Sequence, residues 1–124
     1  MIYEQELVLQ FHKAFGIAIS HKPKIPDKKT CELRKKLIEE EFNELKEAID
    51  NNNMVEAADG LADLLYVIYG TAISFGLDME PIFDEVHRSN MTKIGGHKRE
   101  DGKWIKPETY EPPDLISIIV KQKS

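Results

Sequence analysis

The chain has 124 residues, of which 41% are hydrophobic and 31% charged, and its formal net charge is −5. This composition excludes a wholly disordered chain, and the acidic balance argues against a protein that binds nucleic-acid polymers or anionic membranes. A single cysteine excludes an internal disulfide framework. Because no apolar run of about 18 residues and no signal peptide are visible, we expect no membrane span and a cytoplasmic protein.

Two helices are predicted in the first half of the chain. Apolar residues at three- and four-residue steps indicate a helix over residues 3–19, which the proline-containing segment 22–27 ends. Thr30 is expected to cap a second helix over about residues 31–50. The run Asp-Asn-Asn-Asn at 50–53 is typical of a turn that ends such a helix.

The second half of the chain begins with a third predicted helix over about residues 54–75. It is apolar nearly all round, which is typical of a central, buried helix, and Gly76 is expected to stop it. Asp78 is expected to cap a fourth helix, with Ile82, Phe83 and Val86 facing inward. A basic loop over about residues 92–113 and a short final helix after Pro113 complete a single all-α domain, 1–124, of four or five helices.

The charge is unevenly distributed along the sequence. Residues 39–63 hold nine acidic residues and one lysine, a net charge of −8, whereas residues 21–38 carry +5 and residues 87–106 carry +4. Charge runs of this kind usually form solvated helix faces. The same distribution also suits a site in which the acidic segment binds a cation and the basic segments bind an anion. The positions of the carboxylates help to decide between these two interpretations.

Acidic residues lie beside or within the apolar faces of the second and third helices. Glu41 and Glu44 are three residues apart and border an apolar stripe, and Glu40 shares a face with Glu44. Asp59 and Asp63 are four residues apart on the most apolar helix. An unpaired buried carboxylate costs several kcal/mol or changes its protonation, so these two should be ion-paired or bind metal.

The short turn between the two helices predicts that they are antiparallel neighbours. This arrangement would bring the glutamates of 40–44 opposite Asp59 and Asp63. An all-oxygen cluster suits Mg²⁺ or Mn²⁺. The alternative is that the two aspartates form ion pairs with Lys or Arg from the flanking segments. A di-iron site is disfavoured because the chain has no Glu-x-x-His motif.

Several motifs together are similar to those of one enzyme superfamily. They are Glu-Glu-x-x-Glu at 40–44, Ala-Asp-Leu-Leu-Tyr at 62–66, Phe-His-x-x-Phe-Gly at 11–16 and Val-His-Arg-Ser-Asn-Met-x-Lys at 86–93. In this combination the sequence resembles the all-α nucleoside triphosphate pyrophosphohydrolases. The MazG-like branch, which includes a dUTP-cleaving enzyme, is the most similar, and the resemblance covers nearly the whole chain.

The resemblance implies a helical bundle of the all-α NTP pyrophosphatase type that assembles as a homodimer or a dimer of dimers. It also implies a house-cleaning hydrolase of nucleotide metabolism. Such an enzyme cleaves a nucleoside triphosphate between the α and β phosphates, with Mg²⁺ or alternatively Mn²⁺, to give the monophosphate and pyrophosphate. The expected substrate is dUTP or a related, non-standard nucleotide.

Carried onto this sequence, the resemblance assigns the metal to Glu41, Glu44, Asp59 and Asp63. It makes Glu40 and Glu41 catalytic, with Glu40 either a further ligand or the base that takes the water proton. One position departs from the family signature, which requires a glutamate three residues before the final aspartate, where this chain has Gly60. Asp59 is the favoured replacement and Glu56 the alternative.

Polar residues outside the acidic segment are expected to bind the substrate. The candidates are Arg88, Asn90, Lys93, Lys98, Lys103, Lys106 and His12. The lysines could equally be ordinary surface residues, Asn90 a helix cap, and His12 a hydrogen-bonded core histidine. Gly60 also favours an alternative function, a regulatory bundle that binds nucleotide or metal without catalysis. A helical interaction protein with solvated acids is a third hypothesis.

Overall fold

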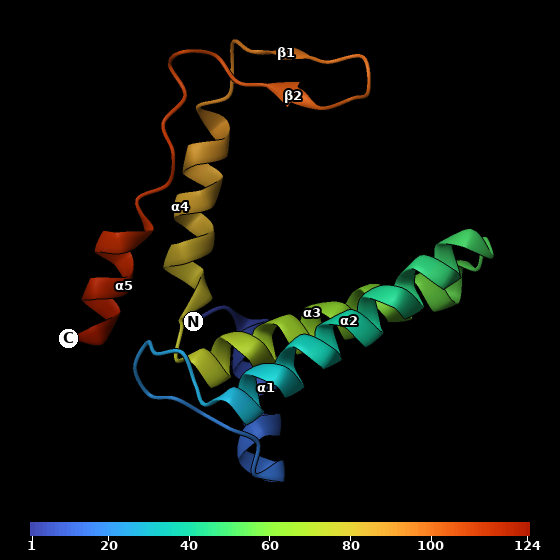
Figure 1. The fold of residues 1–124 in the computed structure, drawn as a ribbon, viewed down its shortest axis with the longest axis vertical. Coiled ribbons are helices and arrows are strands. Elements are labelled where there is room, and N and C mark those ends of the chain that lie inside the picture. The colour runs from blue at the N-terminus through green and yellow to red at the C-terminus, as the bar shows by residue number, and fades with distance from the viewer. The chain divides into compact units, whose positions relative to one another are not determined.

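The computed structural model describes residues 1–124, and its regular secondary structure is almost entirely helical, which confirms the predicted all-α class (Figure 1). The chain forms two compact units, Met1–Met79 and Glu80–Ser124. The prediction of a single domain over 1–124 stays a prediction.

The first unit is built on an antiparallel pair of long helices, α2 (Lys28–Asp50) and α3 (Met54–Phe75). Figure 1 shows these two helices side by side along their length, joined by the short turn at residues 51–53. Helix α1 (Tyr3–Phe15) packs against α3. The predicted antiparallel arrangement of the second and third helices is therefore correct.

Capping residues decide where these helices begin. The Asp27 carboxylate accepts a hydrogen bond from the Thr30 amide at 2.9 Å, so α2 begins at Lys28 and Thr30 lies inside its first turn. The prediction that Thr30 is the cap is therefore wrong, because Asp27 stands one turn earlier and is an equally good capping residue. Asn53 caps α3 in the same way, by accepting from the Glu56 amide at 3.0 Å.

Helix α1 ends at Phe15 rather than at residue 19, because Gly16 adopts a left-handed backbone conformation. The segment that follows packs along the end of α3, as hydrogen bonds show. The Ser20 hydroxyl donates to the Ser74 carbonyl at 2.7 Å, and the Ser74 hydroxyl donates to the Ala18 carbonyl at 2.9 Å. These contacts satisfy backbone carbonyls, including one that the end of a helix leaves unpaired.

The side-chain amide of the fully buried Gln5 fixes the other end of α1. Its nitrogen donates to the Leu77 carbonyl at 2.7 Å, and its oxygen accepts from the Met79 amide at 3.0 Å. One side chain therefore satisfies two backbone groups just beyond α3.

Helix α3 is buried only in part. Ala72 and Ile73 lie in the core, whereas Leu61, Leu65 and Ile68 are 55%, 53% and 40% exposed. Within this chain, α1 and α2 therefore cover only part of the circumference of this apolar helix, as we expect for a chain of four or five helices. No single helix is long and apolar enough to cross a membrane; α3 and the helix over Met79–Met91 pass on length and composition only as a bent pair.

The second unit contains α4 (Met79–Met91, whose first residue ends unit one), a hairpin of β1 (His97–Lys98) and β2 (Trp104–Ile105), and α5 (Leu115–Lys123). The hairpin lies within the predicted loop 92–113, and α5 is the predicted final helix. Ile82 is buried as expected, but Phe83 is 62% exposed, so the prediction that it faces inward is wrong.

Hydrogen bonds and ion pairs hold the segment before α5 against α4. The buried Ser89 hydroxyl donates to the Glu111 carbonyl at 2.7 Å, and the Glu111 amide donates to the Thr92 hydroxyl at 2.8 Å. The Glu85 carboxylate pairs with Arg88 and accepts from the Asp114 amide at 2.7 Å, and these contacts lower the pKa of Glu85 to about 2. Polar contacts, rather than a large apolar core, therefore fix this segment.

His12 lies in the core of the first unit and is only 2% exposed. Burial lowers the pKa of His12, and the positive charge of Arg34 acts in the same direction, although the contact of Nδ1 with the Ala18 carbonyl at 3.1 Å opposes them. The folded protein therefore favours neutral His12.

The unfolding free energy of the protein should fall as the pH is lowered through the range in which His12 takes up a proton. The unfolded chain, in which His12 has its ordinary pKa of 6.5, takes up a proton before the folded protein does. The unfolding free energy should therefore decrease from about pH 7 down to the lowered folded-state pKa, as measured by urea unfolding. His12→Asn should weaken this dependence, and His21→Asn, at an exposed site, should retain it. An unchanged pH dependence in His12→Asn would contradict the assignment.

Candidate metal centre

Three carboxylates meet across the seam between α2 and α3. One oxygen each from Glu41, Glu44 and Asp63 lies within 4.8 Å of the other two. Glu41 and Glu44 stand one helical turn apart on α2, and the antiparallel arrangement brings Asp63 of α3 opposite them. The structure thus brings together three of the four predicted metal ligands.

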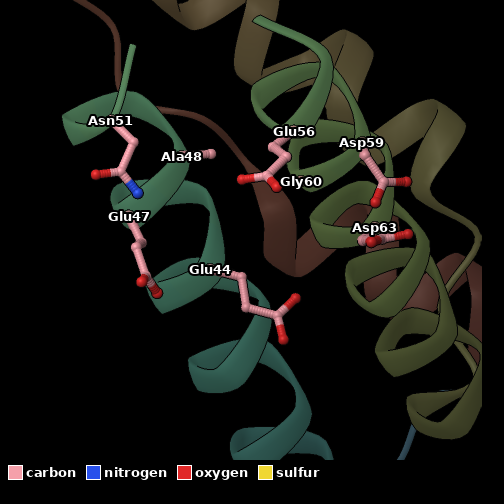
Figure 2. A pocket seen from close by; sticks show the side chains of 8 residues that line it. All are labelled: Glu44, Glu47, Ala48, Asn51, Glu56, Asp59, Gly60 and Asp63. Carbon is pink, nitrogen blue, oxygen red and sulfur yellow. The ribbon is translucent and has the colours of Figure 1, made fainter. Parts of the chain in front are cut away.

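The cluster opens into a pocket of about 340 Å³ between the two helices. Figure 2 shows the Glu44 side chain extending from α2 toward α3, where Asp63 stands. The pocket is lined by Glu44, Glu47, Ala48, Asn51, Glu56, Asp59, Gly60 and Asp63. Asp59, the fourth predicted ligand, and Glu56, its alternative, therefore both line the pocket but lie outside the group of three close oxygens.

Glu41 has the most unusual environment in the cluster. Its Oε2 atom is buried and has no hydrogen-bond partner. Burial raises the pKa of Glu41, and the negative charges of Glu44 and Asp63 raise it further. A carboxylate oxygen in this position lacks the partner that a buried polar atom normally has.

No lysine or arginine forms an ion pair with the clustered carboxylates or with Asp59. The alternative that Asp59 and Asp63 pair with basic residues of the flanking segments is therefore not what the structure shows. The donor set consists of hard oxygen atoms only, which is the set that Mg²⁺ and Mn²⁺ prefer. The residues present fit a divalent cation, which would also partner the buried Oε2 atom of Glu41.

Gly60 stands at a point where the two helices approach closely. A Cβ atom at this position would lie 3.2 Å from the Leu45 Cα atom on α2, which is tighter than ordinary van der Waals contact. A glutamate at position 60 would therefore push α2 away from α3. The departure from the family signature thus coincides with a close helix contact, and Asp59, the adjacent residue, lines the pocket instead.

Glu40 lies beside the cluster without joining it. Its side chain is exposed, and it is absent from the pocket lining. Its negative charge is one of those that raise the pKa of Glu41. Glu40 is therefore close enough to influence the cluster and remains accessible to solvent.

The other predicted site residues lie elsewhere in the chain. His12 is in the core of the first unit, where its Nδ1 atom contacts a backbone carbonyl. Arg88 belongs to the second unit, where its guanidinium donates to Glu85 at 2.7 and 3.0 Å and to Glu111 at 3.0 Å. These contacts give both side chains a structural role.

The four predicted substrate-binding lysines all belong to the second unit. The ammonium groups of Lys93 and Lys106 lie 5.9 and 4.4 Å from the centre of the Tyr110 ring, at distances typical of cation–π contacts. Lys98 in β1 and Lys103 beside β2 are exposed. Asn90 is also exposed, and its backbone carbonyl accepts from the Lys93 amide at the end of α4.

Sequence reasoning missed two polar residues of the pocket lining, Glu47 and Asn51. They follow Glu44 by three and seven residues, so they lie on the same face of α2. This spacing was the signal that could have identified them.

Comparisons with known proteins found two similarities. Residues 8–90 match the family model of phosphoribosyl-ATP pyrophosphohydrolase, a range that contains the whole acidic cluster. The chain is also 35% identical over 79 residues to an uncharacterized protein of Acanthamoeba polyphaga mimivirus. This alignment covers 60% of the chain and 32% of the viral protein, so the chain spans about a third of that relative's length.

Replacing Glu41 should have opposite effects on stability without metal and on metal binding. In metal-free protein, Glu41→Gln should maintain or raise the melting temperature, because it removes a charge that Glu44 and Asp63 repel. Mn²⁺ or Mg²⁺ should raise the melting temperature of the wild type, because a ligand that binds only the folded state stabilises it, and should raise that of the variant much less.

The matched control for this measurement is Glu39→Gln, an exposed position on the same helix outside the cluster. It should respond to Mn²⁺ as the wild type does. An equal response of Glu41→Gln and the wild type to the metal would contradict the assignment of Glu41 as a ligand.

Proposed function

Because this chain belongs to the phosphoribosyl-ATP pyrophosphohydrolase family, we propose that it is a metal-dependent nucleoside triphosphate pyrophosphohydrolase. Membership of the family points to a pyrophosphohydrolase. Our proposal adds that the chain cleaves between the α and β phosphates and releases the nucleoside monophosphate and pyrophosphate. We propose dUTP or a related non-standard nucleotide as the substrate, and the predicted cytoplasmic location stays a prediction.

The observation that carries this proposal is the buried, unpartnered Oε2 atom of Glu41 beside two further carboxylates. A divalent cation at this position would neutralise phosphate charge and lower the pKa of a bound water. We propose Mg²⁺, with Mn²⁺ as a substitute, since both prefer oxygen ligands.

The position of each residue then suggests its role in the reaction. Glu41, Glu44 and Asp63 hold the cation, and Asp59, one turn before Asp63 on α3, completes the set from the pocket wall. Glu40 is exposed beside Glu41 and is the candidate general base, because a base needs access to the attacking water.

From its charge, we propose that the basic segment of residues 87–106 binds the phosphates of the substrate. Residues 87–106 carry a net charge of +4. Lys98 and Lys103 are exposed in this segment, and we propose that they, with Lys93 and Lys106, hold the leaving pyrophosphate. Arg88 and Asn90 would support this segment at the end of α4, where Arg88 is fixed by Glu85 and Glu111.

Asp63→Asn should abolish turnover while the protein stays folded. Loss of a ligand weakens the stabilisation of charge in the transition state, so pyrophosphate release should fall about a hundredfold or more. The measurement is release of pyrophosphate, not phosphate, from dUTP and other nucleotides with Mg²⁺, alongside circular dichroism. Asp50→Asn, at the end of α2 and outside the pocket lining, is the matched control and should stay active. Full activity in Asp63→Asn would overturn the site.

A second candidate function rests on Gly60. Because the signature glutamate is absent and the helices are in close contact there, no carboxylate stands at the signature position. A regulatory bundle that binds nucleotide or metal without catalysis would explain this loss. Tight nucleotide binding without pyrophosphate release, over a broad set of nucleotides and metals, would select this function.

We also propose that the chain assembles as a homodimer or a dimer of dimers. Leu61, Leu65 and Ile68 follow one another at helical spacing on α3 and are substantially exposed. An apolar stripe of this kind on a small protein is typical of an interface. A second copy that buries these side chains would gain the free energy of removing them from water.

Light scattering tests the assembly directly. The particle mass should be two or four times the 14.2 kDa of one chain, and Leu65→Lys should shift it toward one chain. Lys121→Ala, at an exposed position on α5, should leave the mass unchanged. A wild-type mass of one chain at all concentrations would contradict the proposal.

A further inference from the structure

Arg34 of α2 is buried, at 4% exposed, yet no carboxylate pairs with it. Instead, its guanidinium bonds to neutral groups of α3. Nε donates to the Thr71 hydroxyl at 3.1 Å, and Nη2 donates to the Val67 carbonyl at 2.8 Å. Burial of this unpaired charge lowers the pKa of Arg34, which indicates that the arrangement costs free energy. A buried arginine that bonds only to neutral acceptors is unfavourable for stability, which suggests another role for this side chain in the geometry around it.

Gly70 makes room for this contact. A Cβ atom at position 70 would lie 2.5 Å from the Arg34 Nη2 atom and 2.9 Å from the His12 Nε2 atom. The guanidinium therefore occupies space that any side chain on this face of α3 would take. We call these contacts between α2 and α3 the bridge. Arg34 donates its hydrogen bonds, Thr71 and Val67 accept them, and the missing side chain of Gly70 leaves room for the guanidinium.

The bridge and the carboxylate cluster lie along the same seam. Arg34 and Glu41 are seven residues, about two helical turns, apart on one face of α2. Val67 and Asp63 are four residues, about one turn, apart on one face of α3. Beyond the cluster, toward the turn at 51–53, Gly60 is in close contact with Leu45. The cluster therefore lies between two points at which the helices are fixed relative to each other.

Such fixing matters because the three carboxylates repel one another and have no counter-charge from the protein. Helices joined only by the short turn could slide or rotate until the oxygens separate. A slide of α3 by one residue, about 1.5 Å, would already remove the match between ligands. Directional hydrogen bonds to a backbone carbonyl and a hydroxyl resist both movements.

We propose that Arg34 is a positioning residue that fixes the α2–α3 register and thereby holds Glu41, Glu44 and Asp63 ready for a divalent cation. The inference deepens the proposed function and rests on it. Arg34 acts through the helices and does not touch the metal or the substrate. Its loss should therefore weaken metal binding in a protein that remains folded.

The test measures Mn²⁺ affinity by isothermal titration calorimetry without nucleotide, alongside the melting temperature. Arg34→Met keeps most of the side-chain length and removes the donors, and Mn²⁺ affinity should fall about 10- to 100-fold, the range typical for groups that orient metal ligands. Thr71→Val removes one acceptor and should cause a smaller loss, whereas Thr71→Ser retains the hydroxyl and should bind as the wild type does. Gly70→Ala should reproduce the effect of Arg34→Met without altering Arg34.

The control for stability is Val8→Ala, a core truncation in α1 that should lower the melting temperature and leave Mn²⁺ affinity unchanged. If Arg34→Met does not fold, Thr71→Val and Gly70→Ala carry the same test. Folded variants that lower only the melting temperature and bind Mn²⁺ like the wild type would overturn the positioning role and leave the proposed function intact. A wild type that binds no Mn²⁺ would overturn both.

Discussion

Repulsion among Glu41, Glu44 and Asp63 is the constraint that the rest of the first unit must oppose. No basic side chain neutralises these carboxylates, and the buried oxygen of Glu41 has no partner. The α2–α3 pair holds them together through packing and through hydrogen bonds to backbone groups. Part of the folding free energy therefore keeps a charged site assembled, as in other proteins whose functional sites oppose the folding of the chain around them.

Much of this arrangement could be predicted because local signals agreed with one another. The run of asparagines at 51–53 predicts the turn, and an antiparallel pair must then follow. Spacings of three and four residues place Glu41 with Glu44, and Asp59 with Asp63, on shared faces. Aspartate on a strongly apolar helix is costly, which marked Asp59 and Asp63 together. Only the structure separates Asp63, which joins the close group, from Asp59, which lines the pocket wall.

Other features depended on contacts that the sequence does not encode locally. Asp27 and Thr30 are both good caps, and only the backbone geometry selects Asp27. Phe83 and the outer face of α3 carry apolar side chains that remain exposed in the single chain, so periodicity alone gave the wrong burial for Phe83. Arg34 lies in a basic segment that is typical of a solvated surface, and only the gap at Gly70 shows why it enters the core.

The close contact at Gly60 has a consequence for how such enzymes are recognised and altered. A side chain at position 60 could supply a metal ligand, but its Cβ atom would also set the distance between α2 and α3. A sequence search that requires the full acidic signature would pass over this chain, although its pocket keeps an acidic wall through Asp59. Restoring the signature glutamate alone would press its Cβ atom against the α2 backbone and shift the two helices apart at this point by a few tenths of an ångström. An engineered return to the usual pattern would have to move the α2 backbone itself, because the atom nearest to a new side chain is the Leu45 Cα atom, which a smaller residue at position 45 would keep.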